Sequence, residues 1–259
     1  MKNHIRGKIF LMTFFMIMGS LWLHTGMLIA EVTVDDILNK MQQNIAGMND
    51  MKAEIMTTAY MGGQLNTMTQ RMNYYFKKPD KVKMETLTPI KQIMIIIGDK
   101  MTMKTADGKI TTINLSQMLG MDPSQQYFGP DITKMLKNFD VTLNESLSDK
   151  VNNIYVIEFV QKQTTTNTSP VGTFGMPFKT QMFIDYTKGI TIKQKIYGKD
   201  NVLIAITEVK DTRQIESVWL PIITESTAFL PNGQQVKSEM RFENVQVNVG
   251  IGDGEFERR

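Results

Sequence analysis

The chain has 259 residues, 22 methionines, no cysteine and a formal net charge of +3. The entire positive excess, Lys2, Arg6 and Lys8, lies in the first 30 residues, which contain no Asp or Glu and both histidines, His4 and His24. Residues 31–259 therefore carry 26 basic and 26 acidic residues and neither His nor Cys. This composition excludes Ser-His-Asp and Cys-His nucleophiles and His- or Cys-ligated metals from that part of the chain. It also argues against a nucleic-acid partner, which requires clustered cations.

Residues 1–30 have the layout of a secretory signal peptide. The basic leader precedes an apolar run from Ile9 to Leu23, and the small residue Ala30 marks the predicted cleavage site. The run is shorter than the roughly 20 apolar residues that span a bilayer, so an uncleaved anchor is the alternative. We expect export to the periplasm and, in residues 31–259, a single domain with an ordinary hydrophobic core.

One amphipathic helix is predicted over residues 33–46. Apolar residues recur there at helical spacing, Thr33 and Asp36 form a capping-box pattern, and Gly47 is a plausible stop. The helix must therefore lie against an apolar surface.

After this helix the pattern changes to the alternation of β-strands. In residues 64–78, Met68, Met72, Tyr74 and Phe76 share one face. Further strands are predicted at 81–87, 92–97, 100–105, 141–147, 154–160, 179–185, 190–197, 202–211, 219–229 and 234–249. Short turns such as Asn232-Gly233 separate them, which favours one antiparallel, strongly curved sheet.

Two segments interrupt the strand pattern. In residues 114–138, a short turn through Met118 and Leu119 and a helix carrying Met135 and Leu136 are predicted, and both could cover the sheet as lids. Residues 164–178 form a polar loop with interspersed apolar residues. This loop either folds back onto the sheet or forms a mouth that contacts a membrane or a client.

The sequence contains little that is typical of an active site. Gly250 to Gly254 is glycine-rich but no helix follows it, so it is interpreted as a turn and not a phosphate loop. No Gly-x-Ser-x-Gly motif and no calcium-loop spacing are present. The pair Asp35-Asp36 fits a solvated helix face, while a hydrolase built on two distant carboxylates is not excluded by the sequence.

Methionine is the distinctive residue. Residues 31–259 hold 17 methionines, and 14 of them lie between Met41 and Met135. Flexible, polarizable methionines suit an apolar surface that adapts to a ligand such as an acyl chain, although each alone could be core filler. The candidate lipid-binding cavity and lid residues are Met68, Met72, Tyr74, Phe76, Val82, Met84, Ile95, Met101, Met103, Met118, Leu119, Met135 and Leu136.

The order of several motifs resembles one known family. The segment from Tyr75 to Glu85, with Lys78 and Pro79 at its centre, looks like the opening of the LolA-like outer-membrane lipoprotein-sorting proteins. The turn at 98–101, Trp219-Leu220-Pro221 and the close at 242–256 are similar to later parts of that family. The best-known carriers have Arg before the motif proline, where this chain has Lys78, and the two cations form hydrogen bonds differently.

The resemblance implies an incomplete antiparallel β-barrel covered by helices, a mainly β fold with an α lid. It further implies a periplasmic carrier that binds lipoprotein acyl chains or other lipids and moves them toward the outer membrane, with no cofactor. An inner-membrane release complex and an outer-membrane acceptor are its implied partners. The alternatives are a lipid-responsive envelope sensor or scaffold that binds a membrane protein, and the carboxylate hydrolase.

Overall fold

The computed structural model describes residues 31–61, 66–114, 139–162 and 178–257. The chain divides between Val32 and Thr33 into two compact units, and the helices and strands of the described residues all belong to the second, residues 33–259. Among the described residues, no helix combines the length and the apolar character needed to cross a membrane.

The α-helix α2 (Val34–Ala46) begins where the sequence predicts. The Thr33 side chain accepts a hydrogen bond from the Asp36 N–H, and the Asp36 carboxylate accepts one from the Thr33 N–H, so the capping box is complete. Its apolar stripe, Ile37, Leu38 and Met41, is buried. The helix therefore uses one face for packing, as its periodicity requires.

Thirteen strands form one antiparallel sheet, whose order is β6-β5-β4-β3-β2-β1-β13-β12-β11-β10-β9-β8-β7. Two runs of consecutive hairpins meet where the first strand pairs with the last. The sheet does not close, because β6 and β7 each have a single neighbour among the described residues. The strands are β1 (Asp50–Met61), β2 (Asn66–Lys77), β3 (Lys81–Thr88), β4 (Gln92–Ile97), β5 (Lys100–Thr105), β6 (Ile110–Asn114), β7 (Phe139–Leu143), β8 (Ile154–Gln161), β9 (Lys179–Asp185), β10 (Ile190–Tyr197), β11 (Leu203–Ile215), β12 (Val218–Phe229) and β13 (Gln235–Val247).

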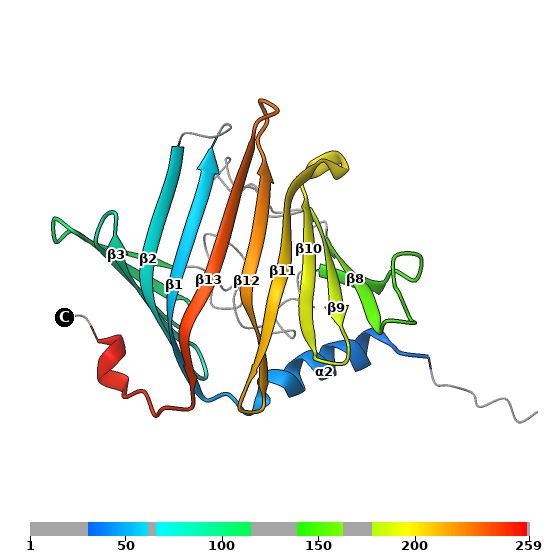
Figure 1. Cartoon of the computed structure of the whole chain (residues 1–259), viewed down its shortest axis with the longest axis horizontal. Coiled ribbons are helices and arrows are strands. Elements are labelled where there is room, and N and C mark those ends of the chain that lie inside the picture. The colour runs from blue at the N-terminus through cyan, green and yellow to red at the C-terminus, as the bar shows by residue number, and fades with distance from the viewer. Residues whose placement is uncertain (1–30, 62–65, 115–138, 163–177, 258–259) are drawn as a thin grey trace, which may run out of the picture. The chain divides into compact units, whose positions relative to one another are not determined.

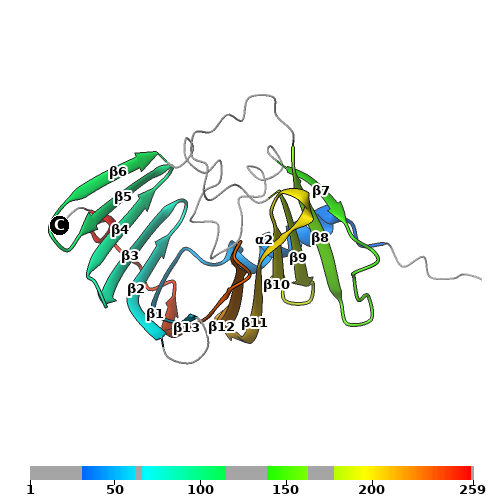
Figure 2. The ribbon, with the colours of Figure 1, turned by 90° about the horizontal axis from the view of Figure 1, so that it is seen from above.

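The sheet is strongly curved, and α2 lies on its concave side. The helix contacts both β12 and β7, which four other strands separate, so it must cross the inside of the curve. Figure 1 views the sheet from its convex side with α2 behind the lower ends of the strands, and Figure 2 shows the curvature from above. We use "lower" and "upper" for the two ends of the strands in the orientation of Figure 1.

The core fills the lower part of the concave face. Met48, just after the helix, is fully buried, and Ile45 of α2 packs against the same cluster. The cluster takes side chains from strands on both sides of the β1–β13 junction, and Tyr74 and Phe242 meet edge to face with ring centroids 6.5 Å apart. Its buried members are Met48, Met51, Ala53, Ile55, Tyr74, Phe76, Val82, Ile96, Val218, Leu220, Ile222, Phe242 and Val247.

Strands β12 and β13 separate at their lower ends. Their pairing ends at Ile223 and Arg241, although each strand continues to pair with its other neighbour (Figure 1). Below that point the Asn44 side chain of α2 accepts a hydrogen bond from Trp219 N–H (2.7 Å) and donates one to Trp219 C=O (2.9 Å). Pro221, two residues further along β12, has no N–H to offer a neighbouring strand. The Asn44 amide thus takes the place of a β13 peptide group at the separation.

The helix also approaches the turn between β9 and β10 closely. A Cβ added to Gly189, whose φ is +68°, would lie 2.5 Å from the carbonyl oxygen of Lys40. We expect Gly189→Ala to destabilise the protein by about 2 kcal/mol or more, because the left-handed backbone and the contact both penalise a side chain.

Gly233→Ala is the matched control for this variant. Gly233 also lies in a hairpin turn with a positive φ, but its added Cβ would meet nothing within 4 Å. Urea unfolding should therefore show a smaller loss for Gly233→Ala, and equal losses would show that the helix contact contributes nothing.

The C-terminal segment, residues 248–256, crosses the convex face. The buried Asp50 carboxylate accepts hydrogen bonds from the backbone N–H groups of Val249 (2.8 Å), Gly250 (3.0 Å) and Ile251 (3.3 Å). The 3₁₀-helix η2 (Asp253–Phe256) follows and contacts β3. The sequence predicts a turn from Gly250 to Gly254, whereas the structure has irregular backbone up to Gly252 followed by the 3₁₀-helix.

Ion pairs hold η2 against β2 and β3. Asp253 Oδ1 lies 2.7 Å from Lys77 Nζ and 2.9 Å from Lys81 Nζ, and Lys83 pairs with Glu255. Hydrogen bonds from Lys77 and then Lys81 lower the pKa of Asp253 to about 2. Because the pKa in the folded state is below that of the unfolded chain, these pairs stabilise at neutral pH and their contribution is lost as the pH falls from about 4 to about 2.

The expected result is therefore a pH-dependent difference between the wild type and Asp253→Asn. Urea unfolding should show the wild type more stable at neutral pH, with the two curves converging as the pH approaches about 2. A difference in stability that stays constant down to that pH would contradict the role assigned to Asp253.

The predicted curved, unclosed antiparallel sheet is confirmed, with three differences in its strands. Strand β1 and the short β6 were not predicted, and β7 covers Phe139–Leu143 where residues 141–147 were expected. Asn144 explains the last difference, because its side-chain oxygen accepts hydrogen bonds from Ser146 Oγ and Leu147 N–H and turns the chain there. The predicted lids, with Met118, Leu119, Met135 and Leu136, lie outside the described residues.

Candidate functional site

Methionines form a row on the concave face of β2 to β5. Residues directly opposite each other in a sheet share a face, and the register places Tyr74, Met84, Met94 and Met103 in one line across the four strands. A second line below it contains Phe76, Val82, Ile96 and Met101. Both lines face the core cluster, and Met84, Met94 and Met101 pack against it while remaining partly exposed.

Burial on this face falls from the lower to the upper end of the strands. Ile55 and Tyr74, near the helix, are sealed in the core. Further up the same faces, Met72 is partly exposed and Met68 is 53% exposed. Residues on the concave face of the central strands are also small here: Ala59, Ser226, Ala228 and Ser238. We call the concave face of the sheet above α2 the trough, and its upper part carries these small side chains beside the exposed Met68.

The structure brings together most of the predicted lipid-binding residues. Tyr74, Phe76 and Val82 belong to the buried core, while the partly exposed or exposed members of the concave face are Met68, Met72, Met84, Met101 and Met103. Ile95 does not join them, because it lies opposite Lys83 and Thr102 on the convex face. Two further methionines, Met94 and Met240, lie on the concave face. The charged neighbours Glu239 and Arg241 could have identified Met240 from the sequence, whereas Met94 lies in the uninterrupted apolar run 93–97 and has no such signal.

Lys78, at the family-motif position, links the sheet to the helix. Its Nζ donates hydrogen bonds to the carbonyl oxygens of Ile45 (2.8 Å) and Ala46 (2.9 Å) in the last turn of α2, and the Ile45 carbonyl also accepts one from Met48 N–H (3.1 Å). Burial lowers the pKa of Lys78. The peptide bond between Lys78 and Pro79 is cis. A cation here therefore fixes the end of the helix that lies beside the core.

Carboxylates lie on the opposite face from the methionine row. Glu208 and Glu225 stand directly opposite each other, and Glu208 bonds Lys193 and Lys210, which lowers its pKa to about 2. Strand carboxylates on the convex face include Glu54, Glu85, Glu158, Glu208, Glu225, Glu239 and Glu243. Within the described residues, no group of three or more His, Cys, Asp or Glu residues could hold a metal.

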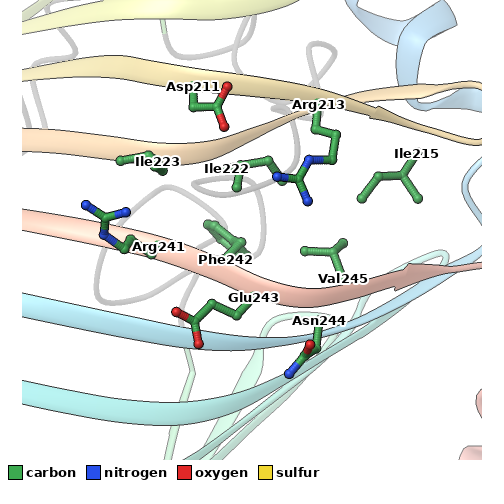
Figure 3. A pocket seen from close by; sticks show the side chains of 10 residues that line it. All are labelled: Asp211, Arg213, Ile215, Ile222, Ile223, Arg241, Phe242, Glu243, Asn244 and Val245. Atoms are coloured by element: carbon green, nitrogen blue, oxygen red, sulfur yellow. The ribbon is translucent and has the colours of Figure 1, made fainter.

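A cavity of about 530 Å³ opens on the convex face where β12 and β13 separate (Figure 3). Core side chains Ile222 and Phe242 line it together with charged residues of both signs, including Arg213 and Glu243. Arg241 at its rim donates from Nε to Glu239 (2.5 Å). Because the cavity lies on the face away from the methionine row, it is separate from the trough.

Comparison with known proteins agrees with this architecture. No family model matches the chain. An uncharacterized protein of Methanocaldococcus jannaschii is 28% identical over 241 residues, which cover 90% of this chain. The chain spans only 65% of that relative's length.

Solved structures with low sequence identity share the fold. A DUF1329 family protein of Desulfovibrio piger superposes with a TM-score of 0.65 at 15% identity, covering 86% of this chain and 95% of that one. A LolA superfamily protein of Nitrosomonas europaea gives 0.62 at 14% identity, covering 88% and 99%. A putative outer membrane lipoprotein-sorting protein domain of Vibrio parahaemolyticus gives 0.62 at 13% identity, covering 86% and 95%. The described unit therefore has the LolA-like fold.

Proposed function

We propose that this protein is a non-enzymatic carrier that binds the acyl chains of lipoproteins or other lipids in the upper part of its concave trough. The observation that carries the proposal is the partly exposed methionine row, Met84, Met94 and Met103, on an apolar face whose lower end is closed by α2. Burial of each methylene of a ligand would contribute about 0.8 kcal/mol. The adaptable thioether side chains suit chains of different length.

The LolA-like fold supports the rest of the proposal. In this view residues 1–30 are an export signal cut after Ala30, and the carrier works in the periplasm. It would receive its cargo from an inner-membrane release complex and pass it to an outer-membrane acceptor. Lys78 would hold the helix beside the trough in the position where the family's best-known carriers have Arg.

Two measurements test the carrier function. Native mass spectrometry of protein purified without detergent should show acyl-bearing adducts, and a fluorescent fatty acid should bind and be displaced by lipid extract. An adduct-free mass together with no binding of the fluorescent fatty acid would refute the proposal. A single stoichiometric protein partner in a pull-down, without lipid, would instead favour the envelope sensor or scaffold.

A further inference from the structure

Large exposed apolar side chains gather at the upper end of the sheet. Ile90 in the β3–β4 turn is 69% exposed, Val202 between β10 and β11 is 60% exposed, and Leu230 follows β12 into its hairpin turn. Seven of the eleven exposed large apolar residues among those described belong to upper turns or strand ends: Tyr60, Met68, Leu87, Ile90, Ile110, Val202 and Leu230. We call these seven residues the upper rim.

The charge of the upper turns differs from that of the lower turns. Residues 88–92, 105–110, 197–203 and 229–237 contain four exposed lysines, Lys91, Lys109, Lys199 and Lys237, against two carboxylates. One of the two, Asp107, accepts hydrogen bonds from Thr105 Oγ1 and Lys109 N–H within its own turn. The lower turns, at 77–81, 97–100, 143–154, 185–190 and 215–218, contain six lysines and six carboxylates. Among the turns that the structure describes, only those at the upper end therefore combine exposed apolar residues with excess positive charge.

The upper rim also lies at the end of the sheet where the concave face is exposed. The concave face is buried near α2 and becomes exposed toward Met68. The exposed part of the concave face and the exposed apolar residues of the turns therefore lie at the same end of the molecule. Figure 1 shows the hairpins β12–β13 and β10–β11 projecting at this end, away from the helix.

We propose that the upper rim docks on the surface of a lipid bilayer that contains anionic headgroups. The apolar side chains stand on separate hairpins with polar residues such as Asn201, Asn232 and Gln234 between them. A specific protein interface has a fully buried, closely packed core that is depleted of charged residues. Separate apolar side chains flanked by lysines instead suit the headgroup region, where fluid lipids fill the space between them and anionic lipids attract the lysines.

This docking goes beyond the carrier function and does not depend on it. Binding to the bilayer surface requires no cargo in the trough, and binding of a fluorescent fatty acid in solution requires no vesicle. The two proposals can therefore fail independently.

The absence of cysteine makes a local test possible in the full chain. Single variants Ile90→Cys, Val202→Cys and Leu230→Cys, each labelled with the environment-sensitive fluorophore NBD, report on the upper rim. Ile97→Cys, Leu147→Cys and Val151→Cys, exposed apolar positions at the lower end, are the matched controls. With phosphatidylglycerol–phosphatidylcholine vesicles, we expect a blue shift and quenching by nitroxide lipids at the upper positions only. Because each label reports its own site, membrane binding through residues 1–30 does not imitate this pattern.

The lysines provide the second measurement. Lys91→Gln/Lys109→Gln/Lys199→Gln should weaken vesicle binding read from the Val202→Cys label by about fivefold per lysine, whereas Lys100→Gln/Lys150→Gln at the lower end should not. The proposal is overturned if the upper labels do not respond to vesicles, if upper and lower labels respond equally, or if the lysine variant binds like the wild type. If the labels at the upper positions respond to an envelope protein but not to vesicles, the upper rim binds a protein partner, and the membrane-docking proposal is overturned.

Discussion

Replacing Met84 and Met94 with glutamine is expected to weaken binding of a fluorescent fatty acid by about tenfold to a hundredfold. The two methionines lie directly opposite each other on β3 and β4, on the concave face, and both are partly exposed. Glutamine is of similar length but carries an amide that loses its hydration against an acyl chain, at a cost of about 1 kcal/mol or more per residue. Fluorescence titration of the double variant against the wild type measures the loss.

The control for this variant uses the other face of β4. Ile93 and Ile97 point to the convex side, away from Met94, so Ile93→Gln/Ile97→Gln adds two amides without touching the trough. Circular dichroism should show all three proteins folded. If the convex variant loses as much affinity as the concave one, or if neither loses any, the methionine row is not the binding surface.

Asn44→Ala is expected to destabilise the protein by about 3 kcal/mol. The variant leaves both the N–H and the C=O of Trp219 without their partner, in a part of β12 that β13 does not pair with. A buried polar group that loses its hydrogen bond lowers the free energy of unfolding by about 1–3 kcal/mol, and this variant removes the partner of two such groups. The midpoint of urea unfolding, with an unchanged slope, would report the effect.

Gln43→Ala provides the comparison on the same helix. Gln43 is exposed and adjacent in sequence, so its replacement should change stability by less than about 0.5 kcal/mol. Similar midpoints for the two variants would mean that water satisfies Trp219 when Asn44 is absent, and that the amide does not stabilise the separation of β12 and β13.

Local patterns in the sequence identified most elements, and the exceptions have particular causes. The capping residues Thr33 and Asp36 located the start of α2, and turn residues such as Asn232-Gly233 separated the hairpins. Strand β1 was missed because its inward residues beyond Ile55 are Thr57 and Ala59, which are too small or polar to give a clear apolar alternation. Ile95 was assigned to the cavity because all of residues 93–97 are apolar, so the sequence alone could not choose its face.

For the candidate site, the sequence indicated which side chains could line it but not which of them lie together in space. The clustering of methionine between Met41 and Met135 indicated an apolar, adaptable surface, and alternation placed Met68, Met72 and Tyr74 on one face. Which of these residues are sealed in the core and which remain exposed depends on where α2 crosses the sheet. That position is set by long-range contacts, such as those of Asn44 with Trp219 and of Lys78 with Ile45.

The sequence by itself determined the class of this protein: a largely β unit without His or Cys, rich in methionine, beginning with a helix. Those properties follow from composition and from short-range periodicity, which operate within a few residues of the chain. Only the tertiary structure decided that β1 pairs with β13, that β12 and β13 separate near Pro221, and that the concave face is buried at one end and exposed at the other. Strands β1 and β13 lie some 200 residues apart in the sequence. Whether such distant strands pair depends on how well their faces pack together, because the neighbours in space decide which face is buried.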